Sequence, residues 1–396
     1  MREDFPFFQR NHKITYMDSA ATSQMLYTVI DDQTEFMLKR KSNAHRSGHS
    51  MGSWVDNKYN ESKELIGKWL GITDPQRKVV FNSGATQGLN DAAALIGRHL
   101  PGGTIFMGID FHHSMYLPFK KLCDDNPWWT IKLIGLDSFG CLDVEQLAKE
   151  VKATEGAKVI AVTAISNVLG KVNDLEKIKI IALESAAISV VDASQIISKR
   201  VVNFSGFDFV AFSWHKVYGP MGLGCLLIDP IWLNFDPVRP GGGSVAGVNI
   251  DNISWLDTAQ KFEAGTQNLQ AIITIPNLVN WLIAHEDELV AHDISISGYV
   301  ATQISDVDFK TASIPDSGLI SLLPVNSTAE DYAMMLDATG VMARAGKRCA
   351  QPLTDHITVN KSLLRLSWAA YTTRQDIDRA FDRIVLINDR LRTTAQ

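Results

Sequence analysis

Short apolar runs rich in β-branched residues alternate with longer helical stretches between about residues 78 and 228. Several of these runs are apolar at nearly every position, which is typical of parallel strands buried on both faces. The helical stretches Leu142–Val151 and Leu175–Ser185 fit crossover connections between such strands. The pattern predicts an α/β domain around a mostly parallel sheet. The expected strands are Lys78–Phe81, Thr104–Met107, Trp129–Ile134, Val159–Ile165, Ile188–Asp192, Phe209–Ser213 and Leu223–Ile228.

The pattern changes after the Gly- and Pro-rich segment Pro237–Gly243. An apolar-periodic helix is expected over Ala271–His285, and beyond about residue 290 the chain has the mixed pattern of a smaller α+β domain. We therefore predict an N-terminal segment (1–25) that packs with the small domain, a large domain (26–290) and a small C-terminal domain (291–396). Elements expected in the last part are strands Leu319–Leu323 and Leu363–Trp368 and helices Ala329–Thr339 and from Arg374 onward.

Composition and charge narrow the possible functions. The 396 residues are 45% hydrophobic and carry a formal net charge of −6 without a long basic run, so we expect a globular protein that does not bind nucleic acid. No stretch approaches the roughly 18 apolar residues of a membrane-spanning helix. The four cysteines form neither a disulfide framework nor a CxxC pair, so we expect no metal site and a reducing, cytoplasmic location.

Polar residues that could bind a ligand or take part in catalysis follow three of the expected strands. The loop Asn82–Gly88 leads from a strand into a helix and could bind a phosphate, although it lacks the Walker lysine and the dinucleotide glycine spacing. Asp192 ends another strand, and Lys216 follows Ser213 and His215 after a third. Each feature alone could be an ordinary turn, cap or surface residue. Together, a phosphate loop, a carboxylate and a lysine at strand ends are what pyridoxal phosphate requires.

With these motifs the chain resembles the class V aminotransferase superfamily of fold-type I pyridoxal-phosphate enzymes, and within it the cysteine desulfurase/selenocysteine lyase branch. The likeness runs from the segment Tyr16–Thr22 to Arg365-Leu366-Ser367, with the motifs in the family's order. The resemblance implies pyridoxal 5′-phosphate as cofactor, a small amino acid as substrate and a homodimer.

The resemblance also assigns roles to single residues. Lys216 would bind the cofactor covalently and later move the Cα proton, Asp192 would pair with the pyridinium nitrogen, and His112 would stack on the ring. His113 is the alternative for the stacking role. The other cofactor contacts implied are Gln195 and Asn167 near the phenolic oxygen, Ala85, Thr86, Ser213 and His215 at the phosphate, and Thr266 at the phosphate of the second subunit.

On the substrate side, the resemblance implies that Arg365 binds the carboxylate with its planar fork. Ala20, Asn167, His45 and Arg344 would also contact the substrate. The pair His45-Arg46 would line the entrance near the dimer interface.

Cys349 decides among the reactions that this cofactor permits. The segment Arg344–Leu353 resembles the desulfurase motif in which a thiolate takes sulfur from L-cysteine or selenium from selenocysteine, releases alanine and passes the persulfide to an acceptor protein. Arg344, Lys347 and Arg348 precede Cys349, and nearby cations lower a thiol pKa. Alternatives are a C–S lyase, epimerase or aminotransferase of the same superfamily, for which Cys349 is dispensable, or a non-catalytic sulfur-relay partner.

Four residues depart from the pattern of this branch. Arg348 stands where a His usually precedes the nucleophile, Phe111 and Gln87 replace glutamates, and Trp214 replaces a glycine. These changes surround the expected site and leave the cofactor residues intact. Because of these changes, the sequence does not identify the substrate or the sulfur acceptor. They favour a specialised paralogue over the housekeeping enzyme of iron–sulfur assembly.

Overall fold

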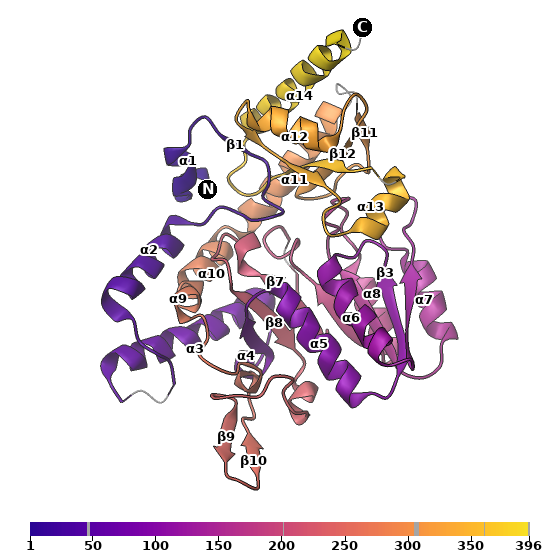
Figure 1. Cartoon of the computed structure of the whole chain (residues 1–396). Helices are drawn as coiled ribbons and strands as arrows, with labels where there is room; N and C mark the ends of the chain where they lie inside the picture. The colour runs from indigo at the N-terminus through magenta and orange to yellow at the C-terminus, as the bar shows by residue number, and fades with distance from the viewer. Residues whose placement is uncertain (46–47, 201, 305–308, 360, 395–396) are drawn as a thin grey trace.

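A seven-stranded sheet forms the centre of the computed structural model, which describes residues 1–45, 48–200, 202–304, 309–359 and 361–394 (Figure 1). The strand order is β2-β8-β7-β6-β5-β3-β4. The strands are β2 (Val79–Asn82), β3 (Gly103–Gly108), β4 (Trp129–Ile134), β5 (Lys158–Thr163), β6 (Ile188–Asp192), β7 (Phe209–Ser213) and β8 (Gly224–Ile228). The α/β fold with a mostly parallel sheet is thereby confirmed.

One strand direction decides where the polar strand ends meet. Within this described sheet β8 runs antiparallel to both β2 and β7, and the other neighbours pair in parallel. Therefore β2, β7, β6, β5, β3 and β4 all point the same way. Their carboxyl ends share one edge, which is where open α/β sheets bind ligands.

Helices cover both faces of this sheet because its strands are apolar on both sides. On one face, alternate strand residues pack with α5 (Ala85–His99) and α6 (His113–Asp125). On the other they pack with α3 (Ser50–Leu70), α7 (Val144–Ala153), α8 (Leu175–Glu184) and α10 (Ile275–Ala284), together with the short α9 (Leu269–Ile272). The sheet is thus the middle of three layers.

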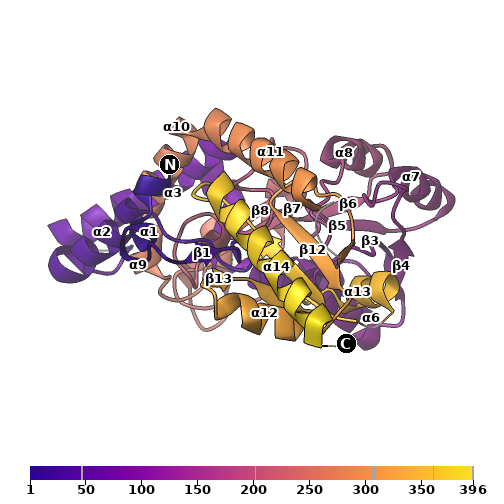
Figure 2. The same ribbon diagram turned by 90° about the horizontal axis from the view of Figure 1, so that it is seen from above.

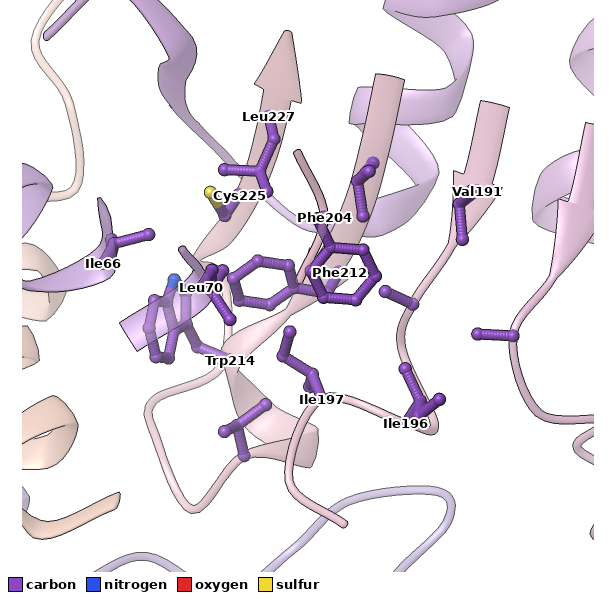
Figure 3. Packing of buried hydrophobic residues seen from close by; sticks show 14 of the residues in the cluster. Ile66, Leu70, Val191, Ile196, Ile197, Phe204, Phe212, Trp214, Cys225 and Leu227 are labelled. Carbon is purple, nitrogen blue, oxygen red and sulfur yellow. The ribbon is translucent and has the colours of Figure 1, made fainter. Parts of the chain in front are cut away.

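Figure 3 shows the second of these cores around Trp214 and Phe212, which pack together with Leu70, Phe204 and Cys225. The ring centroids of Phe212 and Trp214 lie 5.2 Å apart, and Trp214 is fully buried. The large side chain at position 214 is therefore accommodated by the core. Cys225 lies in the same apolar surroundings, and burial raises the pKa of its thiol.

A second, antiparallel sheet has the order β11-β12-β15-β14. Its strands are β11 (Phe309–Thr311), β12 (Leu319–Pro324), β14 (Arg344–Gly346) and β15 (Leu363–Ser367). The helices α11 (Glu286–Gln303), α12 (Ala329–Asp337) and α14 (Arg374–Thr394) pack with it around one apolar cluster, and α13 (Gln351–Thr358) lies beside the first sheet in Figure 1. In the pairing of β14 with β15, Arg344 lies opposite Arg365.

The start of the chain forms a small separate sheet and then contacts the second sheet through one bridge. β1 (Thr15–Tyr16) pairs in parallel with β13 (Val341–Met342), and Asp18 forms an isolated bridge with Ser367. Before it lie η1 (Arg2–Asp4) and α1 (Pro6–Arg10), and after it come α2 (Tyr27–Glu35) and η2 (Phe36–Arg40) along the side of the molecule (Figure 2). The N-terminal segment therefore crosses from the second sheet to the carboxyl edge of the first.

The expected boundary at residue 290 falls inside α11, which is continuous from Glu286 to Gln303. Leu289 of this helix packs in the core of the first sheet, whereas Ile296 and Val300 pack in the core of the second. The division into two domains stays a prediction. Among the described helices, none combines the length and the apolar character needed to cross a membrane.

Asp110 is a buried carboxylic acid two residues beyond β3. Asn173 Nδ2 donates to its Oδ2 at 2.8 Å, while Oδ1 has no hydrogen-bond partner among the described residues. Burial raises the pKa of Asp110 from 3.8 to about 6, and the hydrogen bond from Asn173 only partly opposes this. The protonated form is therefore favoured by folding.

Asp110→Asn is expected to raise the free energy of unfolding at pH 8 by roughly 1–3 kcal/mol, because the amide keeps the Asn173 contact and removes a buried charge. Because its pKa is raised by folding, Asp110 contributes fully to the free energy of unfolding below pH 3.8. This stabilising contribution is lost as the pH rises through about 6. The gain should therefore shrink at pH 5. Denaturant unfolding at both pH values measures it, and a loss of stability at pH 8 would contradict the assignment.

Candidate active site

A cavity of about 340 Å³ lies at the carboxyl edge of the first sheet, between that sheet and the second one. Nearly all residues expected at the site line it: Ala20, Ala85, Thr86, His112, Asn167, Asp192, Gln195, Ser213, His215, Lys216, Arg344, Cys349 and Arg365. We refer to it as the Lys216 pocket. Ala21, Ser114, Ser194 and Arg348 also line it, and the sequence pattern alone did not single them out as contacts.

Thr266 and His45 do not line the Lys216 pocket. They lie together at a second cavity of about 240 Å³, next to Gly243 and Gly265, and Thr266 is exposed. Arg46, expected beside His45, lies outside the described residues. A single chain thus brings these two residues to each other and not to Lys216.

Lys216 lies in the 3-10 helix η3 (Trp214–Lys216), directly after β7. Asp192 ends the neighbouring strand β6, and its Oδ1 accepts a hydrogen bond from Ser194 N at 3.0 Å. Burial lowers the pKa of the Lys216 amine, and the Asp192 carboxylate opposes that shift. A larger fraction of uncharged amine makes Lys216 a better nucleophile and base.

The first turn of α5 forms one corner of the Lys216 pocket. Ala85 N donates to Ser213 Oγ at 2.8 Å, and Thr86 Oγ1 lies 2.7 Å from Ser114 Oγ. Gln87 Oε1 accepts from Ser83 N at 3.0 Å and from Ser83 Oγ at 2.6 Å, which closes the turn. A helix N-terminus and several hydroxyl groups are suited to a phosphate.

Two glycines allow this turn to approach β8. Gly84 has a φ of +148°, a conformation that favours glycine, and a Cβ on Gly224 would overlap the Cα of Gly84.

His215 lies at the same corner and is anchored through its carbonyl oxygen, which accepts from Ser23 N at 2.8 Å. Burial, and secondly the Lys216 charge, lowers the pKa of His215 to about 4.

His112, and not His113, lines the Lys216 pocket. His112 Nδ1 accepts from Ser114 N at 3.1 Å, so Nδ1 carries no proton. Burial, and secondly the Lys216 charge, lowers the pKa of His112 to about 4, so its ring is neutral at neutral pH. His113 Nε2 instead accepts from Gln351 N at 3.3 Å, next to Cys349.

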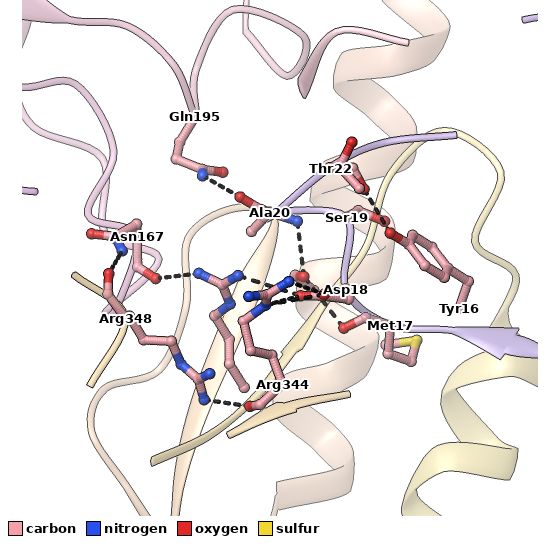
Figure 4. A network of polar contacts seen from close by, with 12 residues as sticks. Tyr16, Met17, Asp18, Ser19, Ala20, Thr22, Asn167, Gln195, Arg344 and Arg348 are labelled. Carbon is pink, nitrogen blue, oxygen red and sulfur yellow. Dashed lines mark hydrogen bonds and ion pairs between the residues drawn. The ribbon is translucent and has the colours of Figure 1, made fainter. Parts of the chain in front are cut away.

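Two amides connect the walls of the Lys216 pocket. Gln195 Nε2 donates to Ala20 O at 2.8 Å, and Asn167 Nδ2 donates to Arg348 O at 2.8 Å (Figure 4). Lys199 Nζ donates to Gln195 Oε1 at 3.4 Å from behind. Burial lowers the pKa of Lys199 to about 8. Lys199 carries no sequence signal, because only the fold brings it to Gln195.

Asp18 lies between two arginines from neighbouring strands (Figure 4). Arg344 Nε and Nη2 donate to its two oxygens at 2.8–3.1 Å, and Arg365 Nη2 lies 3.5 Å from Asp18 Oδ1. Arg365 Nη1 also donates to Asn167 O at 3.1 Å, whereas its buried Nε has no partner among the residues described. Burial lowers the pKa of Arg365 to about 10, so it remains a cation available to a carboxylate.

Cys349 is exposed at the edge of the Lys216 pocket, between β14 and α13. The three preceding cations all have other partners: Arg344 binds Asp18, Lys347 Nζ lies 2.6 Å from Asp355 Oδ1, and Arg348 donates to main-chain carbonyls. The effect of these cations on the Cys349 thiol stays a prediction.

The four departures from the family pattern fall into two groups. Phe111 is buried and stacks on Tyr116 with ring centroids 4.6 Å apart, and Trp214 belongs to the core. Arg348 lines the Lys216 pocket and precedes the thiol, whereas Gln87 lies in the first turn of α5, next to Thr86, and binds Ser83. The latter two departures are therefore neighbours of residues expected at the site.

The donor set of the Lys216 pocket fits pyridoxal 5′-phosphate. A buried carboxylate, an amine, a neutral imidazole and a corner of hydroxyls at a helix N-terminus correspond to the ring nitrogen, aldehyde, ring face and phosphate of that cofactor. Asp192, Lys216, His112, Thr86 and Ser213 would supply these contacts.

Comparisons with known proteins agree with this fit. The family model "Aminotransferase class-V" matches residues 15–380. A probable cysteine desulfurase from Halalkalibacterium halodurans is 30% identical over 92% of this chain and 91% of the relative, and a cysteine desulfurase from Pectobacterium atrosepticum is 30% identical over 96% and 95%.

Two solved structures have the same fold. A cysteine desulfurase from Thermococcus onnurineus has a TM-score of 0.91 at 26% identity, with 98% of this chain and 96% of that one covered. The cysteine desulfurase CsdA from Escherichia coli has a TM-score of 0.87 at 26% identity, with 99% and 98% covered. The chain therefore belongs to the class V aminotransferase family and is a pyridoxal-phosphate-dependent enzyme.

Proposed function

We propose that this enzyme is a cysteine desulfurase that converts L-cysteine, or selenocysteine, to L-alanine and takes the sulfur or selenium on Cys349. The observation that carries the proposal is that Cys349 lines the same pocket as Lys216 and Arg365. The names of the relatives support it. The thiol, the amine and the guanidinium are what sulfur transfer from an amino acid requires.

The residues of this chain have separable tasks in that reaction. The bound cofactor supplies an electron sink that stabilises negative charge at the substrate Cα. Asp192 would hold a proton on the nitrogen of the bound ring, and the neutral His112 would pack on the ring face. Lys216 takes the Cα proton, which its lowered pKa favours. Its position directly after β7 places the amine in the same pocket as Arg365 and Cys349.

Arg365 orients the substrate by its carboxylate. Its Nη1 and Nη2 are restrained by Asn167 O and Asp18, and each keeps a second N–H with which the planar fork can bind the incoming carboxylate. Arg344 forms an ion pair with Asp18 and neutralises its charge. The positive charge of Arg365 is therefore left to attract the substrate carboxylate. The substrate side chain is then directed to one side of the pocket, where Cys349 lies.

Cys349 completes the reaction as a nucleophile. Its thiolate forms a bond to the substrate sulfur while the Cβ–sulfur bond breaks and its electron pair remains on Cβ. Proton transfer to Cβ and release of the carboxylate and amine contacts give alanine, and the chain keeps a persulfide on Cys349. Atoms balance because cysteine and one thiol become alanine and one hydropersulfide.

The proposal includes partners. Thr266 and His45 would contribute to the pocket of a second copy, because in one chain they line a cavity of their own. A sulfur-acceptor protein would take the persulfide from Cys349, which is exposed. We also place the enzyme in the cytoplasm, where reduced thiols persist; within the described residues none of the four cysteines is in a disulfide.

Cys349→Ala is expected to lower alanine release from L-cysteine more than about 100-fold, because the nucleophile is lost, while cofactor absorbance persists. In the wild type, the Cys349 peptide should gain about 32 Da, one sulfur atom. Cys141→Ala, a half-buried cysteine outside the Lys216 pocket, is the matched control. Full alanine release by Cys349→Ala would instead favour a C–S lyase or another class V reaction.

Lys216→Ala is expected to abolish covalent cofactor attachment. Borohydride treatment of the wild type should fix the cofactor on the Lys216 peptide, and mass spectrometry of the peptides reads this out. Lys199→Met is the control, since Lys199 is a buried lysine that contacts Gln195 but does not line the pocket. Labelling of the Lys199 peptide would refute the assignment of Lys216.

Arg365→Lys is expected to raise KM for L-cysteine about tenfold, because lysine keeps the charge but loses the planar fork that binds a carboxylate. The turnover number should change less than KM. Arg379→Lys serves as a control, because Arg379 contacts Thr15 far from the pocket. An unchanged KM would show that another group binds the carboxylate.

A further inference from the structure

The loop that carries Cys349 has an unfavourable backbone conformation. Arg348 has a φ of +59° and Cys349 a φ of +53°, although neither is a glycine. Left-handed backbone is unfavourable for a residue that carries a side chain. Two such residues in succession persist only where their surroundings hold them.

Main-chain contacts hold this loop from the side of the Lys216 pocket. Asn167 Nδ2 donates to Arg348 O at 2.8 Å, and His113 N donates to Cys349 O at 2.6 Å. Gln351 N donates to His113 Nε2 at 3.3 Å. The main chain around the thiol is therefore restrained by Asn167, in the segment after β5, and by His113, at the start of α6.

The Arg348 side chain holds the loop from the opposite side. It is only 8% exposed, and its Nη2 donates to the carbonyl oxygens of Arg344 and Leu363. Leu363 pairs with Gly346, and Arg344 pairs with Arg365. The Arg348 guanidinium thus connects the Cys349 loop to β14 and β15, the two strands that carry Arg344 and Arg365.

The burial of Arg348 is costly. Its Nε and Nη1 have no hydrogen-bond partner, and no ion pair involves it, in the part of the chain that the structure describes. Burial, and secondly the Arg365 charge, lowers its pKa. An apolar side chain would avoid this cost. Stability alone therefore does not account for an arginine at this position.

We propose that Arg348 is a positioning residue that fixes the Cys349 loop at the mouth of the Lys216 pocket by bridging β14 and β15. Its contribution is geometric, because its guanidinium is turned to main-chain carbonyls and not to the thiol. The consequence for sulfur transfer rests on the proposed desulfurase function. The position of the loop itself can be measured without that function.

Three variants of the cofactor-loaded enzyme separate position from charge. Arg348→Lys keeps the charge but is one bond shorter and lacks the planar fork. Arg348→Met removes both charge and donors. Lys347→Met removes the neighbouring cation, which pairs with Asp355 outside the pocket, and is the matched control. Cofactor absorbance and thermal unfolding establish that each variant is folded.

If Arg348 positions the loop, Arg348→Lys and Arg348→Met should both exchange amide hydrogens at 347–351 at least about tenfold faster. Both should also lower kcat for alanine release roughly ten- to hundredfold, with KM changed less than about twofold, because Arg365 remains in place. Lys347→Met should behave as the wild type.

Two results would overturn the proposal. If Arg348→Lys matches the wild type in amide exchange at 347–351 and in kcat while Arg348→Met does not, Arg348 acts by charge and not by position. If neither variant changes exchange at 347–351, Arg348 does not hold the loop. Should the wild type release no alanine from L-cysteine, the proposed function fails, and the exchange rates still decide the role of Arg348.

Discussion

The carboxylate of Asp18 is the contact on which the site depends. The register of β14 and β15 places Arg344 opposite Arg365, and like charges facing each other across two strands destabilise the pair. Asp18 offsets both, and because it comes from the N-terminal segment, it joins the start of the chain to its last strand. From Arg365 the polar contacts continue through Asn167 to the Cys349 loop. One acidic residue thereby connects three distant segments.

Burial then sets the charge state of the pocket. The pKa values of Lys216, His112 and His215 are all lowered chiefly because their charged forms are poorly solvated there. Neutral imidazoles do not repel the lysine or the cationic ring expected in the pocket. The phosphate corner consequently relies on hydroxyls and the N-terminus of α5 more than on cations. A bound dianion would in turn raise the pKa values of nearby bases.

Much of the site could be predicted from sequence because it lies at strand ends. The strands Ile188–Asp192 and Phe209–Ser213 are continuous apolar runs, so the positions of Asp192 and Lys216 followed from the pattern. Residues whose role depends on distant contacts could not be found this way. Lys199 reaches Gln195 only in the fold, and α11 continues through the expected domain boundary because it packs in two cores. Thr266 and His45 line a cavity of their own in one chain, and their place at the pocket of a second chain stays a proposal.

The same limit applies to the cations before Cys349. Neighbours in sequence alternate in direction along β14 and through the left-handed turn, so Arg344, Lys347 and Arg348 reach an aspartate, another aspartate and two carbonyls. A thiol that takes sulfur inside a pocket and passes it to an acceptor outside must be both held and exposed. A short loop restrained by Asn167 and His113 meets both demands, because the restraints act on its main chain and leave the sulfur accessible. The position of the thiol is thus tied to the residues that line the pocket.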